Sequence, residues 1–210
     1  MGHVENQLDP MLRDVLNDSI SRFSGSVSRI QHVEAVAGGS ISRSLNLRTE
    51  SARWFVKLND ADLHEMFEAE ADGLSALSAC PAVRVPRVVA HGVSGRQAFL
   101  IMEHLELLPL TERQAGINAG RALAELHRIT GGEFGWHRPN FIGSTPQFNA
   151  AQRTWPLFFA RQRLRPQLEL AKRQGHKGKF IADGERLAEK LPALMVDHQP
   201  GISLLHGDLW

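Results

Sequence analysis

The chain has 210 residues, with 24 Lys and Arg against 23 Asp and Glu and a formal net charge of +1. This length allows a sizeable core in one domain or two small lobes, and the balanced charge excludes bulk attraction to nucleic acid or to anionic membranes. The single cysteine, Cys80, excludes an internal disulfide, and no stretch has the pattern of a signal peptide or the length of a membrane span. We therefore expect a soluble cytoplasmic protein that binds neither nucleic acid nor membrane.

The first hundred residues carry the pattern of a helix followed by a sheet. Residues 10–23 place apolar side chains on one helical face, which predicts an amphipathic helix packed on a sheet (Leu12, Val15, Leu16, Ile20 and Phe23). Short alternating or β-branched runs predict five strands of an antiparallel sheet, at 32–36, 44–48, 53–58, 87–91 and 97–102. Residues 60–79 interrupt this series as a helix, with Asp62 as its expected N-cap and Glu65 in the capping-box position.

Helical periodicity dominates after residues 103–110. Apolar residues fall on one face of 116–129 (Ala119, Ala122, Leu123 and Leu126) and recur in 184–194 (Leu187, Leu191 and Leu194). Between them, the Gly, Pro and Asn content of 130–149 predicts a long loop. We expect an α+β chain with a β-rich lobe at 1–102, a linker at 103–110 and an α-rich lobe at 111–210.

A glycine-rich segment, AGGSIS at 37–42, lies between two predicted strands. Glycines let backbone N–H groups approach phosphate oxygens closely, so Gly38, Gly39 and Ser40 are candidates to cover the phosphates of a nucleotide. An ordinary hairpin turn is the alternative.

Lys57 and Glu70 form the second candidate pair. Strand alternation puts Lys57 on the face opposite Trp54, Val56 and Leu58, and Glu70 occupies an inward position on the apolar stripe of the next helix. A carboxylate on such a stripe requires a cation, because an unpaired buried charge is costly. A strand lysine paired to a helix glutamate is how protein kinases position the ATP phosphates; a plain structural salt bridge is the alternative.

Two further segments complete the candidate site. The apolar run at 99–105 ends in a polar connector where main-chain groups could bind adenine, with Glu103, His104 and Leu105 as candidates. Near the end of the chain, His206, Gly207 and Asp208 follow the apolar run ISLL. In this order they read as a catalytic loop, with Asp208 accepting the proton of the acceptor hydroxyl and His206 bracing the loop.

These segments together resemble the fructosamine kinase family, also called ketosamine-3-kinases, within the wider aminoglycoside phosphotransferase and choline kinase group. The resemblance covers roughly residues 10–210 and rests on FVKLN, MFEAEADGLSAL, VRVPRVVAHG, FLIMEHL, GRALAELHR, NFIGSTPQFN, WPLFFARQRL and LLHGDLW in that order. It implies a protein-kinase-like two-lobed fold, with one helix inserted in the β-rich lobe and an incomplete α-rich lobe.

The resemblance also implies an activity, which is ATP-dependent phosphorylation of a sugar hydroxyl on a ketosamine, leading to deglycation. The acceptor would be a small ketosamine or a glycated protein lysine. Lys57 and Glu70 would position the phosphates, Gly38, Gly39 and Ser40 would cover them, residues 103–105 would bind adenine, and Asp208 would be the catalytic base. Asn140, Gln147 and Asn149 would shape the acceptor side, although such side chains could equally cap helices and satisfy backbone groups.

The metal ligands mark a departure from the family pattern. Kinase-type sites hold Mg²⁺ with an Asn five residues after the catalytic Asp and with a later Asp, and these 210 residues contain neither. The sequence therefore predicts no metal ligand within the chain, and we expect the 210-residue chain alone to be inactive and to self-associate through apolar surface.

Two other functional classes remain open at this point. One is a small-molecule kinase of the aminoglycoside, choline or homoserine type, and the other is a non-catalytic module that binds nucleotide or a partner. A basic run follows residue 160, and its default interpretation is a solvated helical hairpin (Arg161, Arg163, Arg165, Lys172, Arg173, Lys177 and Lys179).

Overall fold

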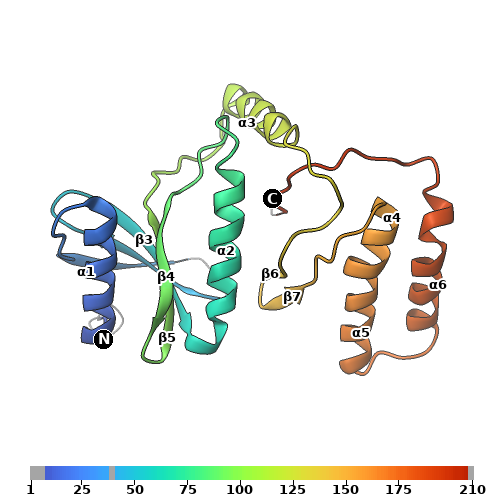
Figure 1. The fold of residues 1–210 in the computed structure, drawn as a ribbon, viewed down its shortest axis with the longest axis horizontal. Coiled ribbons are helices and arrows are strands. Elements are labelled where there is room, and N and C mark those ends of the chain that lie inside the picture. Colours follow the sequence, from blue (N-terminus) through green and yellow to red (C-terminus); the bar gives the residue numbers. More distant parts are fainter. Residues whose placement is uncertain (1–7, 38–40, 208–210) are drawn as a thin grey trace. The chain divides into compact units, whose positions relative to one another are not determined.

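A computed structural model describes residues 8–37 and 41–207. The chain divides into two compact units, residues 1–123 and residues 124–210 (Figure 1). Strands dominate the first unit and helices the second, as the sequence predicts for an α+β chain. Each unit is described by itself below.

The first unit is built on a five-stranded antiparallel sheet. Its strands are β1 (His32–Val36), β2 (Arg43–Arg48), β3 (Arg53–Asp60), β4 (Val88–Ser94) and β5 (Gln97–Glu103). They lie in the order β1-β2-β3-β5-β4, so β1 and β4 are the two edges. The five strands predicted from alternation are confirmed, with bounds that differ by at most a few residues.

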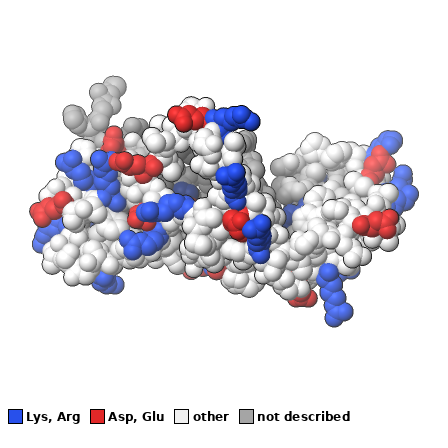
Figure 2. All heavy atoms as spheres, turned by 90° about the horizontal axis from the view of Figure 1, so that it is seen from above, with Lys and Arg blue, Asp and Glu red and all other residues white. Residues whose placement is uncertain are grey.

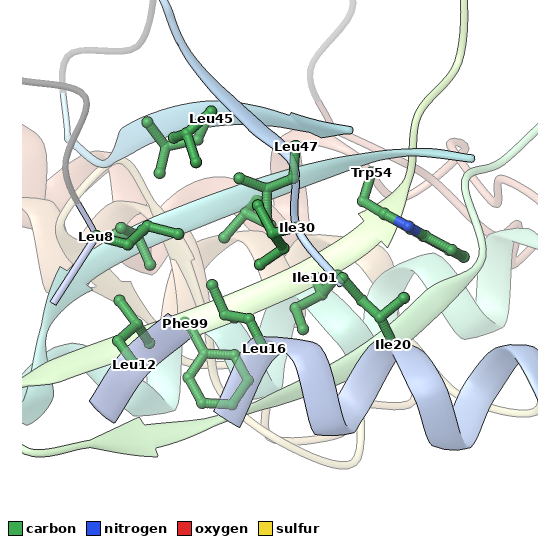
Figure 3. Close-up of a cluster of buried hydrophobic side chains, with 13 residues drawn as sticks. Leu8, Leu12, Leu16, Ile20, Ile30, Leu45, Leu47, Trp54, Phe99 and Ile101 are labelled. Atoms are coloured by element: carbon green, nitrogen blue, oxygen red, sulfur yellow. The ribbon is translucent and has the colours of Figure 1, made fainter. Parts of the chain in front are cut away.

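Helix α1 (Pro10–Ser24) covers one face of this sheet. Asp9 caps the helix by accepting a hydrogen bond from the N–H of Leu12 at 3.1 Å, and Pro10 occupies the first turn, where it costs no hydrogen bond. The inward face packs on alternate residues of β2, β3 and β5 (Figure 3; Leu12, Leu16 and Ile20 against Leu45, Leu47, Trp54, Val56, Phe99 and Ile101). Burying each large side chain contributes about 1.5–3 kcal/mol, so this layer anchors the unit.

Helix α2 (His64–Leu77) covers the opposite face (Figure 1). Phe67 and Ala71 pack on Ala98, Leu100 and Met102 of β5. The prediction that Asp62 caps this helix is wrong, because β3 runs directly into a 3₁₀ turn (Ala61–Leu63) that contains it. The residue before α2 is Leu63, which makes no side-chain cap.

Helix α3 (Arg113–Leu126) leads from the first unit toward the second, and only Leu126 is buried on it. Residues 130–149, predicted as a long loop, contain a short hairpin formed by β6 (Asn140–Ile142) and β7 (Thr145–Gln147). The loop prediction is wrong for these two strands and right for the rest of the segment, which contains no helix or strand. Strands of three residues, one of them with Pro146 at its centre, produce no alternation that a sequence could reveal.

The rest of the second unit is a helical hairpin. Helix α4 (Trp155–Phe158), a π-helical segment (Phe159–Leu164) and α5 (Arg165–Arg173) follow one another, and α6 (Lys179–Leu194) packs against them. The predicted inward face of α6 is partly wrong, since Leu191 is buried while Leu187 and Leu194 are 45% and 66% exposed. The run ISLL forms one isolated antiparallel bridge, between Ser203 and Thr130, instead of a strand.

Charged residues of both signs are interspersed on the face shown in Figure 2. This distribution agrees with the near-zero net charge. Among residues 8–37 and 41–207, none of the helices combines the length and the apolar composition that a bilayer crossing requires.

Candidate nucleotide site

An ion pair between Lys57 and Glu70 lies at the centre of the first unit. The Nζ atom of Lys57 donates a hydrogen bond of 2.6 Å to Oε1 of Glu70. The two side chains are 30% and 32% exposed, so the pair is only partly covered by the rest of the protein. The structure thus brings together the two residues that the sequence singled out; their role in phosphate binding stays a prediction.

Strand and helix periodicity produce this contact. Lys57 lies opposite Leu100 of β5, and neighbours in register point to the same face of a sheet, which here is the face that α2 covers. On α2, Phe67 and Ala71 anchor the helix to that face, and Glu70 lies between them in sequence, one turn after Phe67. The anchored stripe therefore carries the carboxylate to the lysine.

The glycine-rich candidates Gly38, Gly39 and Ser40 lie outside the described residues. The flanking strands are nevertheless informative, because β1 and β2 pair up to Val36 and Ser44, and Ser44 lies opposite Lys57 on β3. Strand β2 begins one residue before Ser44, at Arg43, which lies opposite Leu58 of β3.

Asn59 adds a contact that the sequence did not single out. Its Nδ2 atom donates hydrogen bonds of 3.2 Å to the carbonyl of Ile41 and to Oγ of Ser42. Asn59 shares a strand face with Lys57, and this shared face was the one signal available in the sequence. The side chain fixes the residues that follow the glycine-rich segment.

The end of β5 holds the three linker candidates. Glu103 accepts a hydrogen bond of 2.9 Å from Nη2 of Arg84, and its own N–H donates to the carbonyl of Arg87 at 2.9 Å. The N–H of His104 donates to the carbonyl of Arg53 at 3.4 Å. These two N–H groups already donate to the carbonyls of Arg87 and Arg53. The main-chain groups left for the predicted adenine contact are therefore the carbonyls of residues 103–105 and the N–H of Leu105.

Asn149 is the centre of a polar cluster in the second unit. It is 4% exposed, its Nδ2 atom donates bonds of 3.0 Å to the Arg138 carbonyl and to Oδ1 of Asn140, and its Oδ1 accepts one of 2.7 Å from Nη2 of Arg163. Asn140 in turn lies opposite Gln147 in the hairpin. The structure therefore brings the three acceptor-side candidates together. The amide group of Asn149 is already occupied by hydrogen bonds to Arg138, Asn140 and Arg163.

Arg163 supports this cluster from the π-helical segment. It also donates a bond of 2.6 Å to the Phe148 carbonyl, and its guanidinium lies 4.6 Å from the centre of the Phe158 ring. Removal from water lowers the pKa of Arg163 below its ordinary value, which is the cost that these contacts offset. The sequence suggested only a solvated basic run here.

The proposed catalytic loop is described up to Gly207. The N–H of Leu204 donates to the carbonyl of Ile129 at 2.9 Å, which attaches the segment before the loop to the rest of the second unit. His206 is exposed. Asp208, the proposed base, lies outside the described residues, so its role stays a prediction.

Comparison with known proteins assigns the family. The sequence model of the family described as fructosamine kinase matches residues 12–210. A protein assigned as a ketoamine kinase in Synechocystis sp. is 41% identical over 192 residues, which are 91% of this chain and 64% of that protein. The chloroplastic protein-ribulosamine 3-kinase of Oryza sativa subsp. japonica is 33% identical over 205 residues, which are 96% of this chain and 58% of that protein.

Solved structures show the same fold. The crystal structure of a protein assigned as a fructosamine-3-kinase from Haemophilus somnus 129PT has a TM-score of 0.83 at 27% identity, covering 93% of this chain and 65% of that one. The aminoglycoside phosphotransferase APH(4)-Ia has a TM-score of 0.52 at 16% identity, covering 90% of this chain and 61% of that one, which concerns the fold alone. The predicted protein-kinase-like α+β fold is confirmed.

The chain spans about three fifths of the length of the curated relatives it matches, with shares of 64%, 59% and 60% for three of them. Within that span the match runs from α1 to Trp210 and includes both Lys57 and Glu70. The chain belongs to the fructosamine kinase family.

Proposed function

We propose that this chain binds ATP as part of a kinase that phosphorylates a sugar hydroxyl of ketosamines. The observation that carries the proposal is the Lys57–Glu70 pair, 2.6 Å apart on β3 and α2. A strand lysine held by a helix glutamate presents one fixed positive charge to the phosphates. In a family of kinases, this placement favours phosphate positioning over a plain salt bridge.

The other roles follow from the same proposal. Gly38, Gly39 and Ser40 cover the phosphates, and residues 103–105, at the start of the linker 103–110, bind adenine. Asp208 accepts the proton of the acceptor hydroxyl, and His206 braces its loop. Mg²⁺ would neutralise charge on the phosphates when bound; its kinase-type ligands, an Asn and a later Asp after Asp208, do not occur in these 210 residues.

The acceptor class rests on the relatives. The names of the Synechocystis and rice proteins refer to a ketoamine and to protein ribulosamine. We therefore propose ketosamines, either small molecules or glycated lysines of proteins, as acceptors. In the whole protein, Asp208→Asn should abolish ADP formation that depends on fructosyl-lysine or ribulosyl-lysine, and an aminoglycoside should not replace these acceptors.

The nucleotide site can be tested directly on this chain. Lys57 is the only lysine before Lys172, so an acyl-phosphate derivative of ATP that modifies lysines near bound phosphates has one candidate target in the first unit. We expect modification of Lys57, detected by peptide mass spectrometry, and its suppression by excess ATP. Equal modification of Lys57 with and without ATP would contradict the proposal.

Variants of α2 supply the matched control. Glu70→Ala should weaken ATP binding about tenfold or more, a loss of about 1.4 kcal/mol or more, because the lysine is no longer held in place. Glu65→Ala, an exposed position on the same helix, should leave ATP binding unchanged. Isothermal titration with ATP measures both.

A further inference from the structure

Three potential metal ligands meet at the start of α2, the helix that also carries Glu70. They are His64, Glu68 and His91, and each offers one ligand atom within 4.8 Å of the others. Nδ1 of His91 lies 3.3 Å from Nε2 of His64, and Nδ1 of His64 lies 3.6 Å from Oε1 of Glu68. His64 and Glu68 are half-buried and His91 is exposed.

The backbone holds these side chains in place. His64 and Glu68 are four residues apart on α2, so they lie one above the other on the same side of the helix. His91 lies opposite Leu100 of β5 and therefore points to the sheet face that α2 covers. Helix α2 and edge strand β4 pack against each other (Figure 1), so all three donors project from regular elements and not from loops.

The donor set selects a class of metal. Two imidazoles and one carboxylate are the ligands of open three-residue Zn²⁺ sites, whereas Mg²⁺ and Ca²⁺ prefer oxygen donors only. Zn–N bonds of about 2.0–2.1 Å at tetrahedral angles place neighbouring ligand nitrogens about 3.4 Å apart. The 3.3 Å between the facing nitrogens of His64 and His91 matches that spacing.

Exposure makes the site reachable. His91 lies on the edge strand, so a hydrated ion can approach without opening the core, and a water molecule can complete the coordination. Oε1 of Glu68 lies beside Nδ1 of His64, the ring nitrogen that does not face His91, so the Glu68 side chain must turn to bind the same ion. We propose that His64, Glu68 and His91 form a binding site for Zn²⁺ or a similar divalent transition metal, separate from the magnesium that a kinase uses with ATP.

The site would join the first turn of α2 to strand β4. The metal site is independent of the proposed kinase activity, because neither its ligands nor its titration involve nucleotide or acceptor. A hydrogen-bonded histidine pair with no affinity for metal is the competing interpretation, since the same atoms already contact one another.

Metal titration of the metal-free 210-residue chain decides between a metal site and a histidine pair without affinity for metal. We expect isothermal titration with Zn²⁺, in buffer with excess Mg²⁺, to give one saturable site per chain. Co²⁺ should give the intense visible bands of tetrahedral coordination without a thiolate charge-transfer band, because the only thiol, that of Cys80, is buried. Absence of saturable binding at sub-millimolar Zn²⁺ would overturn the proposal.

Variants identify the ligands. His91→Ala and His64→Ala should each weaken Zn²⁺ binding at least about tenfold, and Glu68→Gln should weaken it measurably. His32→Ala is the matched control, because His32 is an exposed strand histidine on β1, the opposite edge of the same sheet, and its loss should change nothing. If His64→Ala fails to fold, exposed His91 still provides the test. Equal affinity in wild type and His91→Ala would also overturn the proposal.

Discussion

Lys57 and Glu70 form a contact of 2.6 Å in which each side chain remains about one third exposed, at 30% and 32%. An ion pair this open contributes at most about 1 kcal/mol to the free energy of unfolding, because water screens it and ordering two long side chains costs entropy. Its main effect is to fix where the ammonium group lies. Stability and nucleotide affinity should therefore respond differently to its loss.

Glu70→Gln tests whether protein stability and ATP affinity respond differently to loss of the ion pair. We expect the free energy of unfolding, from urea denaturation, to fall by less than about 1 kcal/mol, while ATP affinity falls about tenfold. In a cycle with Lys57→Met, the losses in ATP affinity should be less than additive, because both variants remove the same placed charge. A loss of stability above about 2 kcal/mol with unchanged ATP affinity would identify a plain structural salt bridge.

Gly184 controls how closely α5 and α6 pack. A Cβ atom added at Gly184 would lie 2.5 Å from Cδ2 of Leu168, which is 5% exposed. Overpacking costs about 1–3 kcal/mol and the helical Gly→Ala change returns about 0.5–1 kcal/mol, so we expect Gly184→Ala to lower the free energy of unfolding by up to about 2 kcal/mol. Gly120→Ala is the control, because a Cβ atom there meets no heavy atom within 4 Å, and it should stabilise the helix by about 0.5–1 kcal/mol.

Leu168→Ala gives the decisive comparison for that contact. It removes the atoms that a new Cβ would strike, so the double variant Gly184→Ala, Leu168→Ala should lose less stability than the sum of the two single variants. Strict additivity would show that Gly184→Ala acts through some other contact.

The sequence predicted the first unit well because local periodicity fixes the direction of side chains. Alternation in β3 separates Lys57 from Trp54 and Val56, and the helical stripe carries Glu70 toward the sheet. Those two facts predict the contact between Lys57 and Glu70, which are 13 positions apart, without knowledge of strand order. The contact between His91 and His64 could not be predicted in this way, because it depends on where β4 lies in the sheet.

The second unit was predicted less well because its contacts depend on small residues. The buried residues of α6 are Ala188 and Leu191, and half-buried Gly184 lies one turn before Ala188. The leucine pattern predicted Leu187, Leu191 and Leu194, of which Leu191 alone is buried. Gly184 and Ala188 permit the close approach of α5 and the π-helical segment, but they carry little hydrophobic signal. A pattern weighted by side-chain size therefore identifies Leu191 and misses the small residues of the same face.

Asn149 offers a choice between a structural and a substrate-binding role. It is buried, and its amide holds Arg138, Asn140 and Arg163. Asn149→Ala should lower the free energy of unfolding by about 1–3 kcal/mol, because it leaves buried polar groups without their partners. Asn140→Ala removes one of these three bonds from a less buried position and should cost less. Full stability of Asn149→Ala together with weaker ketosamine binding by the whole protein would favour the substrate-binding role.

Glu185 on α6 and Lys172 on α5 form an ion pair that should make the second unit sensitive to acid. Hydrogen bonding to Lys172 lowers the pKa of Glu185 below its ordinary value, while hydrogen bonds to Glu169 and then to Glu185 raise the pKa of Lys172. A carboxyl whose pKa is lower in the folded state stabilises the fold above its unfolded pKa, and this contribution is lost as pH falls through the folded pKa. The raised pKa of Lys172 has the opposite sign, so its contribution is lost only at alkaline pH.

Glu185→Gln should therefore melt at a lower temperature than wild type at neutral pH, and the difference should shrink toward zero as pH falls below the folded pKa of Glu185. Thermal unfolding of both proteins across the acid range measures this difference. Glu189→Gln, an exposed position on the same helix, should show a smaller difference at neutral pH. A gap between wild type and Glu185→Gln that stays constant into acid would mean that Glu185 stabilises α6 through packing or helix propensity, because only the contribution of its charge disappears on protonation.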